Sequence, residues 1–258
     1  MADVHPSAII ETGASLGAGV VVEAFAVVGQ HVELGDDVVV GPHAVISGHT
    51  RVGRGTRISS HVCLGCRPQD RDYAGEPTRL EIGQLNEIRE HVTVSLGTER
   101  GGGCTSIGDG NLIMNGSHVG HDCRVESHCE IASFTGLAGH VMVESYAVLG
   151  AYTGVHQFCR VGEGAMVASG AKLSLDAPPF ALVAGDRARL VGLNEIGLRR
   201  RNVGDEALVA LKAAFRVLFR SGLRFEKAVE QIRLGASIPP QILQLLHFLE
   251  KSERGFCR

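Results

Sequence analysis

The sequence predicts a mainly β fold: a solenoid of short parallel strands, followed by a small α-helical C-terminal domain. Three observations predict it: an aliphatic residue at every sixth position, small residues after many of these positions, and a change to helical spacing near the C-terminus. A period of six fits neither an α-helix, with 3.6 residues per turn, nor a single strand, with a period of two. It fits a coil of short segments, each of which keeps one side chain inside.

The six-residue pattern occurs in two long runs. The first is Val4–Leu64 and the second is Ile107–Leu173, with a shorter stretch at Ile82–Val94 between them. Glycine often follows the aliphatic residue, as in Val28-Gly29, where it suits a corner. Three hexads per turn give coils of about eighteen residues that stack at about 4.8 Å, the usual distance between paired strands. We therefore expect a triangular prism of three parallel sheets.

Two interruptions mark places where the chain does something besides stacking. The first covers residues 66–79 and carries Asp70 and Glu76 where the pattern would place aliphatic residues. The second covers residues 97–104 and includes three consecutive glycines. Either could be a tolerated surface insertion. The crowded charge of the first favours a functional role.

The solenoid is expected to occupy residues 1–186, with its repeats ending after Leu173. Pro178 and Pro179 follow, and proline cannot donate to a strand ladder. Beyond them, apolar residues recur at helical spacing between Leu208 and Leu249 and predict three or four helices. Residues 187–258 should therefore form a helical domain that docks on the last coils.

Charge divides the chain in the same way. Residues 1–186 carry 11 Lys and Arg against 21 Asp and Glu, a net charge of −10; residues 187–258 carry 14 against 7, a net charge of +7, and together they give the −3 of the whole chain. A basic module on an acidic solenoid indicates an anionic partner. No apolar run is long enough to span a membrane, and the first residues lack the features of a signal peptide. We expect a cytoplasmic protein without an integral membrane segment.

The seven cysteines do not form a spaced framework, and we expect them to be reduced. A histidine cluster is the stronger candidate for chemistry. With about eighteen residues per coil, His121, Gly139-His140 and His156-Gln157 fall on successive coils at nearly the same angular position. Imidazoles in this arrangement can hold zinc, act as a general base or form a structural ladder. The carboxylate of Asp122 favours a general base, because it can fix the tautomer and stabilise the imidazolium. We expect no metal.

Five motifs are specific when they are taken together. They are Tyr73–Arg79 (YAGEPTR), His118–Cys123 (HVGHDC), Leu137–Val141 (LAGHV), Val155–Phe158 (VHQF) and Gly197–Arg201 (GLRRR). In this order they closely resemble the acyl-ACP:UDP-N-acetylglucosamine O-acyltransferases that begin lipid A synthesis, a family of hexapeptide-repeat transferases. The resemblance covers almost the whole chain, including both interruptions and the helical tail.

The resemblance implies a left-handed parallel β-helix, since hexapeptide-repeat proteins have that hand. It also implies a homotrimer with active sites in clefts between neighbouring subunits. The reaction moves a 3-hydroxyacyl chain from acyl carrier protein to the 3-position of UDP-GlcNAc. The implied partners are thus acyl carrier protein and a UDP-amino sugar, without nucleic acid, and no cofactor is needed because acyl-ACP is a co-substrate.

The family's functional residues map onto this sequence position by position. His121 would be the general base, Asp122 would orient it, and the Gly139 N–H would face the developing oxyanion. The residues implied to hold the sugar and acyl chain are Asp70, His118, His140, His156 and Gln157. Those implied to meet the uridine and phosphates are Asn194, Arg200 and Arg201. The candidates for docking the acidic carrier protein, or alternatively a solvated helix face, are Arg199, Arg216, Arg220 and Arg224.

Three positions depart from the family pattern. Asp72 stands where members usually have lysine, so the first loop would hold two carboxylates without that cation. An amine at the sugar 3-position would be attracted there, which makes UDP-2-acetamido-3-amino-2,3-dideoxyglucose an alternative acceptor; otherwise Arg71 replaces the lost charge. Glu195 lies one residue before the family's usual acid, which puts its nucleotide contact in doubt. Ser169 occupies the chain-length position and predicts an acyl chain of medium length.

Two other functions remain alternatives. A CoA-dependent hexapeptide acetyltransferase would accept acetyl-CoA, whereas this chain should require acyl-ACP. A non-catalytic solenoid that only binds a partner would lose nothing when His121 is replaced.

Overall fold

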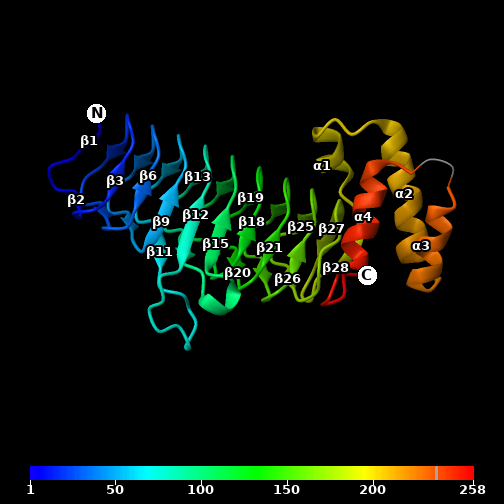
Figure 1. The fold of residues 1–258 in the computed structure, drawn as a ribbon. Helices are drawn as coiled ribbons and strands as arrows, with labels where there is room; N and C mark the ends of the chain where they lie inside the picture. The colour runs from blue at the N-terminus through cyan, green and yellow to red at the C-terminus, as the bar shows by residue number, and fades with distance from the viewer. Residues whose placement is uncertain (236–237) are drawn as a thin grey trace.

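The structure is a computed structural model and describes residues 1–235 and 238–258. Figure 1 shows a straight row of coils with the N-terminus at one end and a group of helices at the other. Consecutive short strands belong to three different sheets, and strands one coil apart pair in parallel, as Val21 does with Val39. The predicted prism of three parallel sheets is confirmed.

Sheet A contains eleven strands, which are all parallel except the last. They are β1 (Asp3–Val4), β4 (Val21–Val22), β7 (Val39–Val40), β10 (Arg57–Ile58), β13 (Glu87–Ile88), β16 (Leu112–Ile113), β19 (Glu130–Ile131), β22 (Val148–Leu149), β25 (Met166–Val167), β27 (Ala181–Ala184) and β28 (Arg189–Leu193).

Sheet B contains nine strands and forms the face that carries the groove described below. They are β2 (Ile9–Ile10), β5 (Val27–Val28), β8 (Val45–Ile46), β11 (Cys63–Cys66), β14 (Thr93–Ser95), β17 (His118–Val119), β20 (Gly136–Leu137), β23 (Gly154–Val155) and β26 (Lys172–Leu173).

Sheet C contains eight strands. They are β3 (Ser15–Leu16), β6 (Glu33–Leu34), β9 (His49–Val52), β12 (Arg79–Ile82), β15 (Cys104–Ile107), β18 (Arg124–Val125), β21 (Met142–Val143) and β24 (Arg160–Val161).

The aliphatic hexad positions form the core of the prism. Val40, Ile88, Ile131 and Leu149 are each 0% exposed, and their strand partners on adjacent coils are equally aliphatic. Most of the short strands contribute one such side chain, so the core is a stack of apolar layers that gains free energy from the burial of each layer. The first coil is open to water, where Val4 is 36% exposed.

The end of the solenoid differs from the sequence-based expectation. Sheet A continues beyond Leu173, because β27 pairs in parallel with β25 and β28 pairs antiparallel with β27. Pro178 and Pro179 lie in the turn before β27, where no ladder N–H is required. The segment expected to begin the helical domain at residue 187 therefore contains a strand, and the first helix begins at Glu195.

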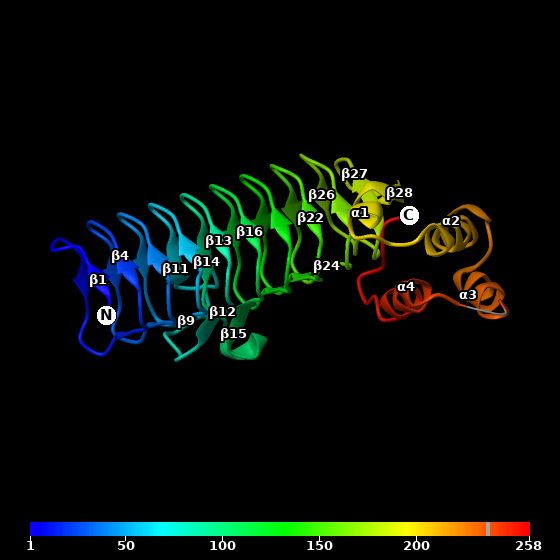
Figure 2. The ribbon, with the colours of Figure 1, turned by 90° about the horizontal axis from the view of Figure 1, so that it is seen from above.

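Four helices follow β28 in the described residues: α1 (Glu195–Arg200), α2 (Asp205–Arg220), α3 (Phe225–Arg233) and α4 (Pro240–Glu250). The buried side of α2, which includes Leu211 and Phe215, packs against α3 and α4, and α2 also contacts β28. Figure 2 shows α2, α3 and α4 beyond the last coil and α1 next to it. Within residues 1–235 and 238–258, no helix is both long and apolar enough to cross a membrane.

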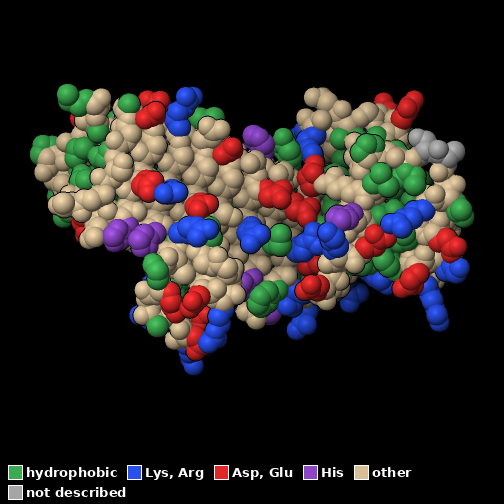
Figure 3. Space-filling model, in the orientation of Figure 1, with side chains coloured by type: hydrophobic (Ala, Val, Ile, Leu, Met, Phe, Trp, Pro, Cys, Tyr) green, Lys and Arg blue, Asp and Glu red, His purple; other side chains and the backbone are tan. Residues whose placement is uncertain are grey.

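The two interruptions project from the same side of the prism, the first below β11 and the second below β15 in Figure 1. The first connects β11 to β12, and its buried Tyr73 donates its hydroxyl to the Glu76 carbonyl at 2.8 Å. The second connects β14 to β15 and contains a 3-10 helix, Glu99–Gly101. Acidic and basic side chains lie side by side on the projecting part (Figure 3). The fold thus brings both loops next to sheet B.

Candidate active site

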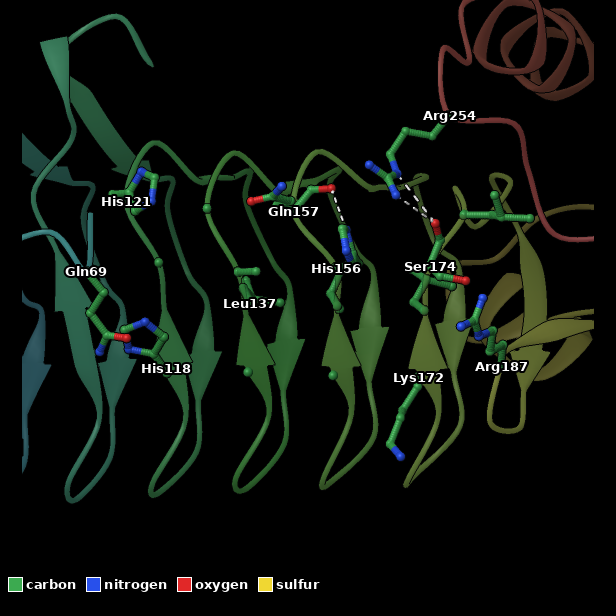
Figure 4. Close-up of a pocket in the computed structure, with 18 of the residues that line it drawn as sticks. Gln69, His118, His121, Leu137, His156, Gln157, Lys172, Ser174, Arg187 and Arg254 are labelled. Carbon is green, nitrogen blue, oxygen red and sulfur yellow. Dashed lines mark hydrogen bonds between the residues drawn. The ribbon is translucent and has the colours of Figure 1, made fainter. Parts of the chain in front are cut away.

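A groove of about 1050 Å³ runs along sheet B over the coils of β17, β20, β23 and β26. His118, His121, Gly139, His156 and Gln157 line it, as Figure 4 shows for the labelled side chains. Of the residues expected from the family motifs, the fold therefore gathers these five on one surface. Gln69, from the first loop, also lines the groove and had not been singled out in the sequence.

His121 and Asp122 form a close pair at the corner after β17. Nδ1 of His121 lies 2.7 Å from Oδ2 of Asp122, and the two side chains are 15% and 1% exposed. Asp122 has a φ of 60°, in the left-handed region that aspartate tolerates better than most residues. This backbone conformation turns the carboxylate inward, against the second loop, while the imidazole stays at the groove.

The second loop fixes the Asp122 carboxylate. Thr98 donates its backbone N–H to Oδ1 at 2.8 Å and its hydroxyl to Oδ2 at 2.7 Å. The Asp122 N–H donates to the hydroxyl oxygen of Thr105 at 2.8 Å. Gly101 packs directly on the carboxylate, because a Cβ at that position would lie 2.0 Å from Asp122 Cγ. The sequence did not identify Thr98, Gly101 or Thr105 as site residues. It indicated only that the glycine-rich interruption at residues 97–104 departs from the repeat.

Gly139 lies directly beneath the His121 ring. A Cβ on Gly139 would be 2.6 Å from both Cε1 and Nε2 of His121, so a side chain there would displace the imidazole. In the part of the chain that the structure describes, the Gly139 N–H donates to no acceptor. It is therefore available to a ligand in the groove. The coil register places Gln157, one residue beyond His156, in line with His121 and Gly139.

The neighbouring histidines differ in their surroundings. Nδ1 of His118 lies 2.7 Å from the Thr93 hydroxyl, and burial lowers the pKa of His118, with a smaller contribution from His121. His140 stacks on Phe158 with ring centroids 4.4 Å apart, and its Nε2 is 3.8 Å from Oδ2 of Asp122. Burial also lowers the pKa of His140, while Asp122 opposes that shift. Both rings therefore favour the neutral form.

Asp72 pairs with Arg100 of the second loop, with Oδ2 and Nη1 2.6 Å apart. The expectation that the first loop lacks a nearby cation is therefore wrong, and Arg100, not Arg71, supplies it. Asp70 accepts a hydrogen bond from the Asp72 N–H at 3.0 Å and does not line the groove. The loop is therefore not without a cation, although the Asp72–Arg100 pair is exposed and its contribution is small.

The residues expected at the nucleotide lie outside the groove of their own chain. Asn194 caps α1 by accepting from the Gly197 N–H at 3.0 Å, and its amide donates to the Gly164 carbonyl at 3.0 Å. Arg201 forms an ion pair with Glu163 and lies over the Tyr146 ring, 4.3 Å from its centroid. Arg200 is exposed at the end of α1.

Glu195 pairs with Lys212, with their charged atoms 2.9 Å apart. Ser169 is exposed at the corner between sheets A and B and does not line the groove. Of the four arginines expected to dock a carrier protein, only Arg216 and Arg220 border the same depression. Arg199 faces Asp205 at 3.4 Å, Arg220 donates to the Val191 carbonyl at 2.9 Å and borders a depression with Arg216, and Arg224 is exposed just before α3.

A cation could in principle meet His121, Asp122 and His140, whose ligand atoms lie within 4.8 Å of one another. Both oxygens of the Asp122 carboxylate, however, already accept hydrogen bonds from Thr98, and Oδ2 also faces Nδ1 of His121. A carboxylate in these contacts is suited to orienting an imidazole. The donor set fits acid–base chemistry better than metal ligation.

A β-helix whose groove combines an oriented imidazole with a free backbone N–H has the features of a hexapeptide-repeat transferase. Residues 104–139 match the family model for bacterial transferase hexapeptides, and residues 176–257 match domain 2 of UDP N-acetylglucosamine O-acyltransferase. Proteins named acyl-[acyl-carrier-protein]–UDP-N-acetylglucosamine O-acyltransferase from Alkalilimnicola ehrlichii and Herminiimonas arsenicoxydans are 48% and 45% identical, each over the full length of both chains. This chain belongs to that family.

Solved structures of similar proteins agree with this family assignment. The UDP-N-acetylglucosamine acyltransferase from Campylobacter jejuni has a TM-score of 0.94 at 37% identity, and the O-acyltransferase from Moraxella catarrhalis has a TM-score of 0.96 at 34% identity. Each comparison covers 99% of both chains. The predicted fold class, a left-handed parallel β-helix with a small helical C-terminal region, is confirmed, as is the family resemblance.

Proposed function

We propose that this protein transfers a 3-hydroxyacyl chain from acyl carrier protein to the 3-hydroxyl of UDP-GlcNAc, the reaction that begins lipid A synthesis. Its relatives carry the name of this O-acyltransferase. The observation that carries the proposal is the His121–Asp122 pair, whose ring lies over Gly139 in the groove. The names of these relatives support the hydroxyl as the acceptor, and the Asp72–Arg100 pair supplies the first loop with a cation.

The geometry supports a general-base mechanism. With the Nδ1 proton directed to Asp122, Nε2 of His121 is free to take the proton of the sugar hydroxyl. The sugar oxygen attacks the thioester carbonyl, and the Gly139 N–H stabilises the resulting oxyanion. This attack forms the ester C–O bond, and collapse of the tetrahedral intermediate restores the carbonyl and breaks the C–S bond. The imidazolium, which Asp122 stabilises, returns the proton to the leaving thiolate of the carrier.

The nucleotide and carrier contacts belong to the same proposal. Since Asn194, Arg200 and Arg201 do not line the groove of their own chain, they can serve it only from a neighbouring copy. This supports a homotrimer, for which light scattering should give about three times the chain mass of 27.3 kDa. We place the enzyme in the cytoplasm with its co-substrates.

The carrier contact is proposed on the basic side of α2. Lys212, Arg216 and Arg220 recur there every four residues and border one depression beside β28, in which Lys212 is paired with Glu195. Such spacing places the three cations on one side of the helix. The acidic carrier protein would be steered to this surface, and its association should weaken as salt is added.

The test offers the purified protein UDP-GlcNAc and its 3-amino analogue together with 3-hydroxyacyl-ACPs, and identifies products by mass spectrometry. Ester from acyl-ACP is expected, with none from acetyl-CoA, and His121→Ala should lower kcat by at least about a thousandfold. His43→Ala is the control, because His43 stacks between Phe25 and His61 in the early coils. Amide as the main product, transfer from acetyl-CoA, or full activity of His121→Ala would overturn the proposal.

A further inference from the structure

Both ends of helix α1 are fixed by a single corner of the solenoid, between β24 and β25. The side-chain amide of Asn194, which caps the start of the helix, donates to the Gly164 carbonyl at 3.0 Å. Arg201, at the end of the helix, forms an ion pair with Glu163. The main chain adds a further tie, because Phe180 N–H donates to the Glu163 carbonyl at 2.8 Å and Asn194 N–H donates to the Phe180 carbonyl at 2.7 Å. The helix that carries the expected nucleotide contacts is thus seated on residues 163 and 164.

The Arg201 guanidinium extends a stack of rings along this edge of the prism. His128, Tyr146 and Gly164 occupy the same corner on successive coils, and their φ values are 61°, 61° and 60°. The His128 and Tyr146 rings stack with centroids 5.0 Å apart, and Cζ of Arg201 lies 4.3 Å from the Tyr146 centroid. A Cβ on Gly164 would lie 2.6 Å from Nη1 of Arg201. Since histidine and tyrosine occupy the same φ one and two coils earlier, the glycine serves here to make room for the guanidinium.

The Glu163 carboxylate is itself held in place, because both of its oxygens have partners. Oε1 pairs with Nη2 of Arg201, and Oε2 accepts a hydrogen bond from Nε2 of Gln244, on α4, at 2.5 Å. The Glu163 and Arg201 side chains are 23% and 26% exposed, so water competes only in part for their contact. A charge-assisted contact that is shielded in this way holds a long side chain better than an exposed pair does.

We propose that Glu163 is a positioning residue for the sugar nucleotide: it holds Arg201 in the place from which that arginine meets the phosphates in the groove of a neighbouring copy. This inference rests on the proposed function. A guanidinium whose face lies on an aromatic ring keeps the donors at its edge for an anion. Within the described residues, Arg201 donates only through Nη2, so its other N–H groups have no partner in the chain.

Holding Arg201 in advance should strengthen nucleotide binding. A free arginine side chain samples many rotamers and must be immobilised when it contacts a phosphate, which typically weakens binding by about two- to tenfold. Glu163 and the Tyr146 ring impose this order before the nucleotide arrives. The chemical step takes place at the His121 imidazole, which Glu163 does not contact. The contribution of Glu163 should therefore appear in KM for UDP-GlcNAc and not in kcat.

Three variants test this role. Glu163→Ala should raise KM for UDP-GlcNAc and Kd for UDP about fivefold, with kcat nearly unchanged. Glu163→Gln keeps an oxygen that can accept from Arg201 and should restore most of the loss. Gln244→Ala is the matched control, because it removes the other contact of the Glu163 carboxylate and leaves the pair with Arg201 in place; it should keep both constants. The Tm of each variant shows whether it folds.

A double substitution shows whether the effect passes through Arg201. If it does, Glu163→Ala should raise KM and Kd no further in an Arg201→Ala background. Losses that add in the double variant, unchanged constants in folded Glu163→Ala, or an equal rise in Gln244→Ala would overturn the inference.

The Kd for UDP is measured by calorimetry, and KM is measured from ester formation with acyl-ACP. A wild-type protein that forms no ester with any carrier would refute the proposed function. The calorimetric comparison of wild type, Glu163→Ala and Gln244→Ala needs no acyl transfer and would still test Glu163, so the two failures are distinguishable.

Discussion

Gly139→Ala should disturb the position of the imidazole that we propose as the general base, His121, without lowering the stability of the fold. The added methyl would lie 2.6 Å from Cε1 and Nε2 of His121, whereas carbon contacts normally begin at about 3.5 Å. The ring must therefore move by about 1 Å. Gly139 has no positive φ, so its backbone accepts alanine without strain.

A displacement of this size should lower kcat strongly. Moving the ring also stretches its 2.7 Å contact with Asp122, which holds the tautomer needed for proton transfer. Misplacing a reacting group by 1 Å typically costs about 10² in rate. We expect kcat for ester formation to fall about a hundredfold, with a much smaller change in KM for UDP-GlcNAc.

Steady-state kinetics with acyl-ACP, together with thermal unfolding, would check this expectation. Gly204→Ala is a suitable control, because Gly204 precedes α2 and a Cβ there meets no atom within 4 Å. The control should keep its kcat. Wild-type kcat in a folded Gly139→Ala protein would refute the inference that the groove depends on close contact between His121 and Gly139.

Three further predictions concern the residues around the site and the titration of its groups. Thr98→Val removes the hydroxyl that donates to the buried Asp122 carboxylate, so it should lower the free energy of unfolding by about 2 kcal/mol and kcat by about tenfold. The control Thr135→Val removes a hydrogen bond to a backbone carbonyl and should lower only the free energy of unfolding, by about 1 kcal/mol; urea unfolding and steady-state kinetics would measure both effects. Burial lowers the pKa of His118, so as pH falls the unfolded chain binds this proton before the folded chain does. The free energy of unfolding should therefore fall as pH drops below about 6.5. His118→Gln should make this decrease less steep, and an unchanged slope would contradict the lowered pKa of His118. Burial raises the pKa of the Cys66 thiol to about 11, so its alkylation at neutral pH should be far slower in the folded than in the urea-unfolded protein; equal rates would count against the burial.

The sequence predicted the solenoid because the period is a direct consequence of the architecture. Residues eighteen positions apart stack on adjacent coils, so the aliphatic hexads indicated the core, and the positions of His121 and Gly139 indicated one surface. The end of the solenoid was predicted less well. Pro178 and Pro179 interrupt the pattern locally, but they occupy a turn, and the sheet continues through β27.

Contacts between the loops and the coils were decided by the tertiary structure alone. Thr98 and Gly101 hold Asp122, and Arg100 neutralises Asp72, although no period relates these residues. The sequence could predict only that the loops interrupt the repeat and that one is crowded with charge.

The sequence by itself determined the repeat, the stacking of the histidine region and the family of this protein. The tertiary structure decided which side chains meet in the groove, including Gln69 of the first loop. The physical reason is that stacking repeats at a fixed interval and can be counted along the chain. The packing of the loops and their ion pairs bring together residues whose separation in the sequence follows no fixed interval, so they cannot be counted in this way.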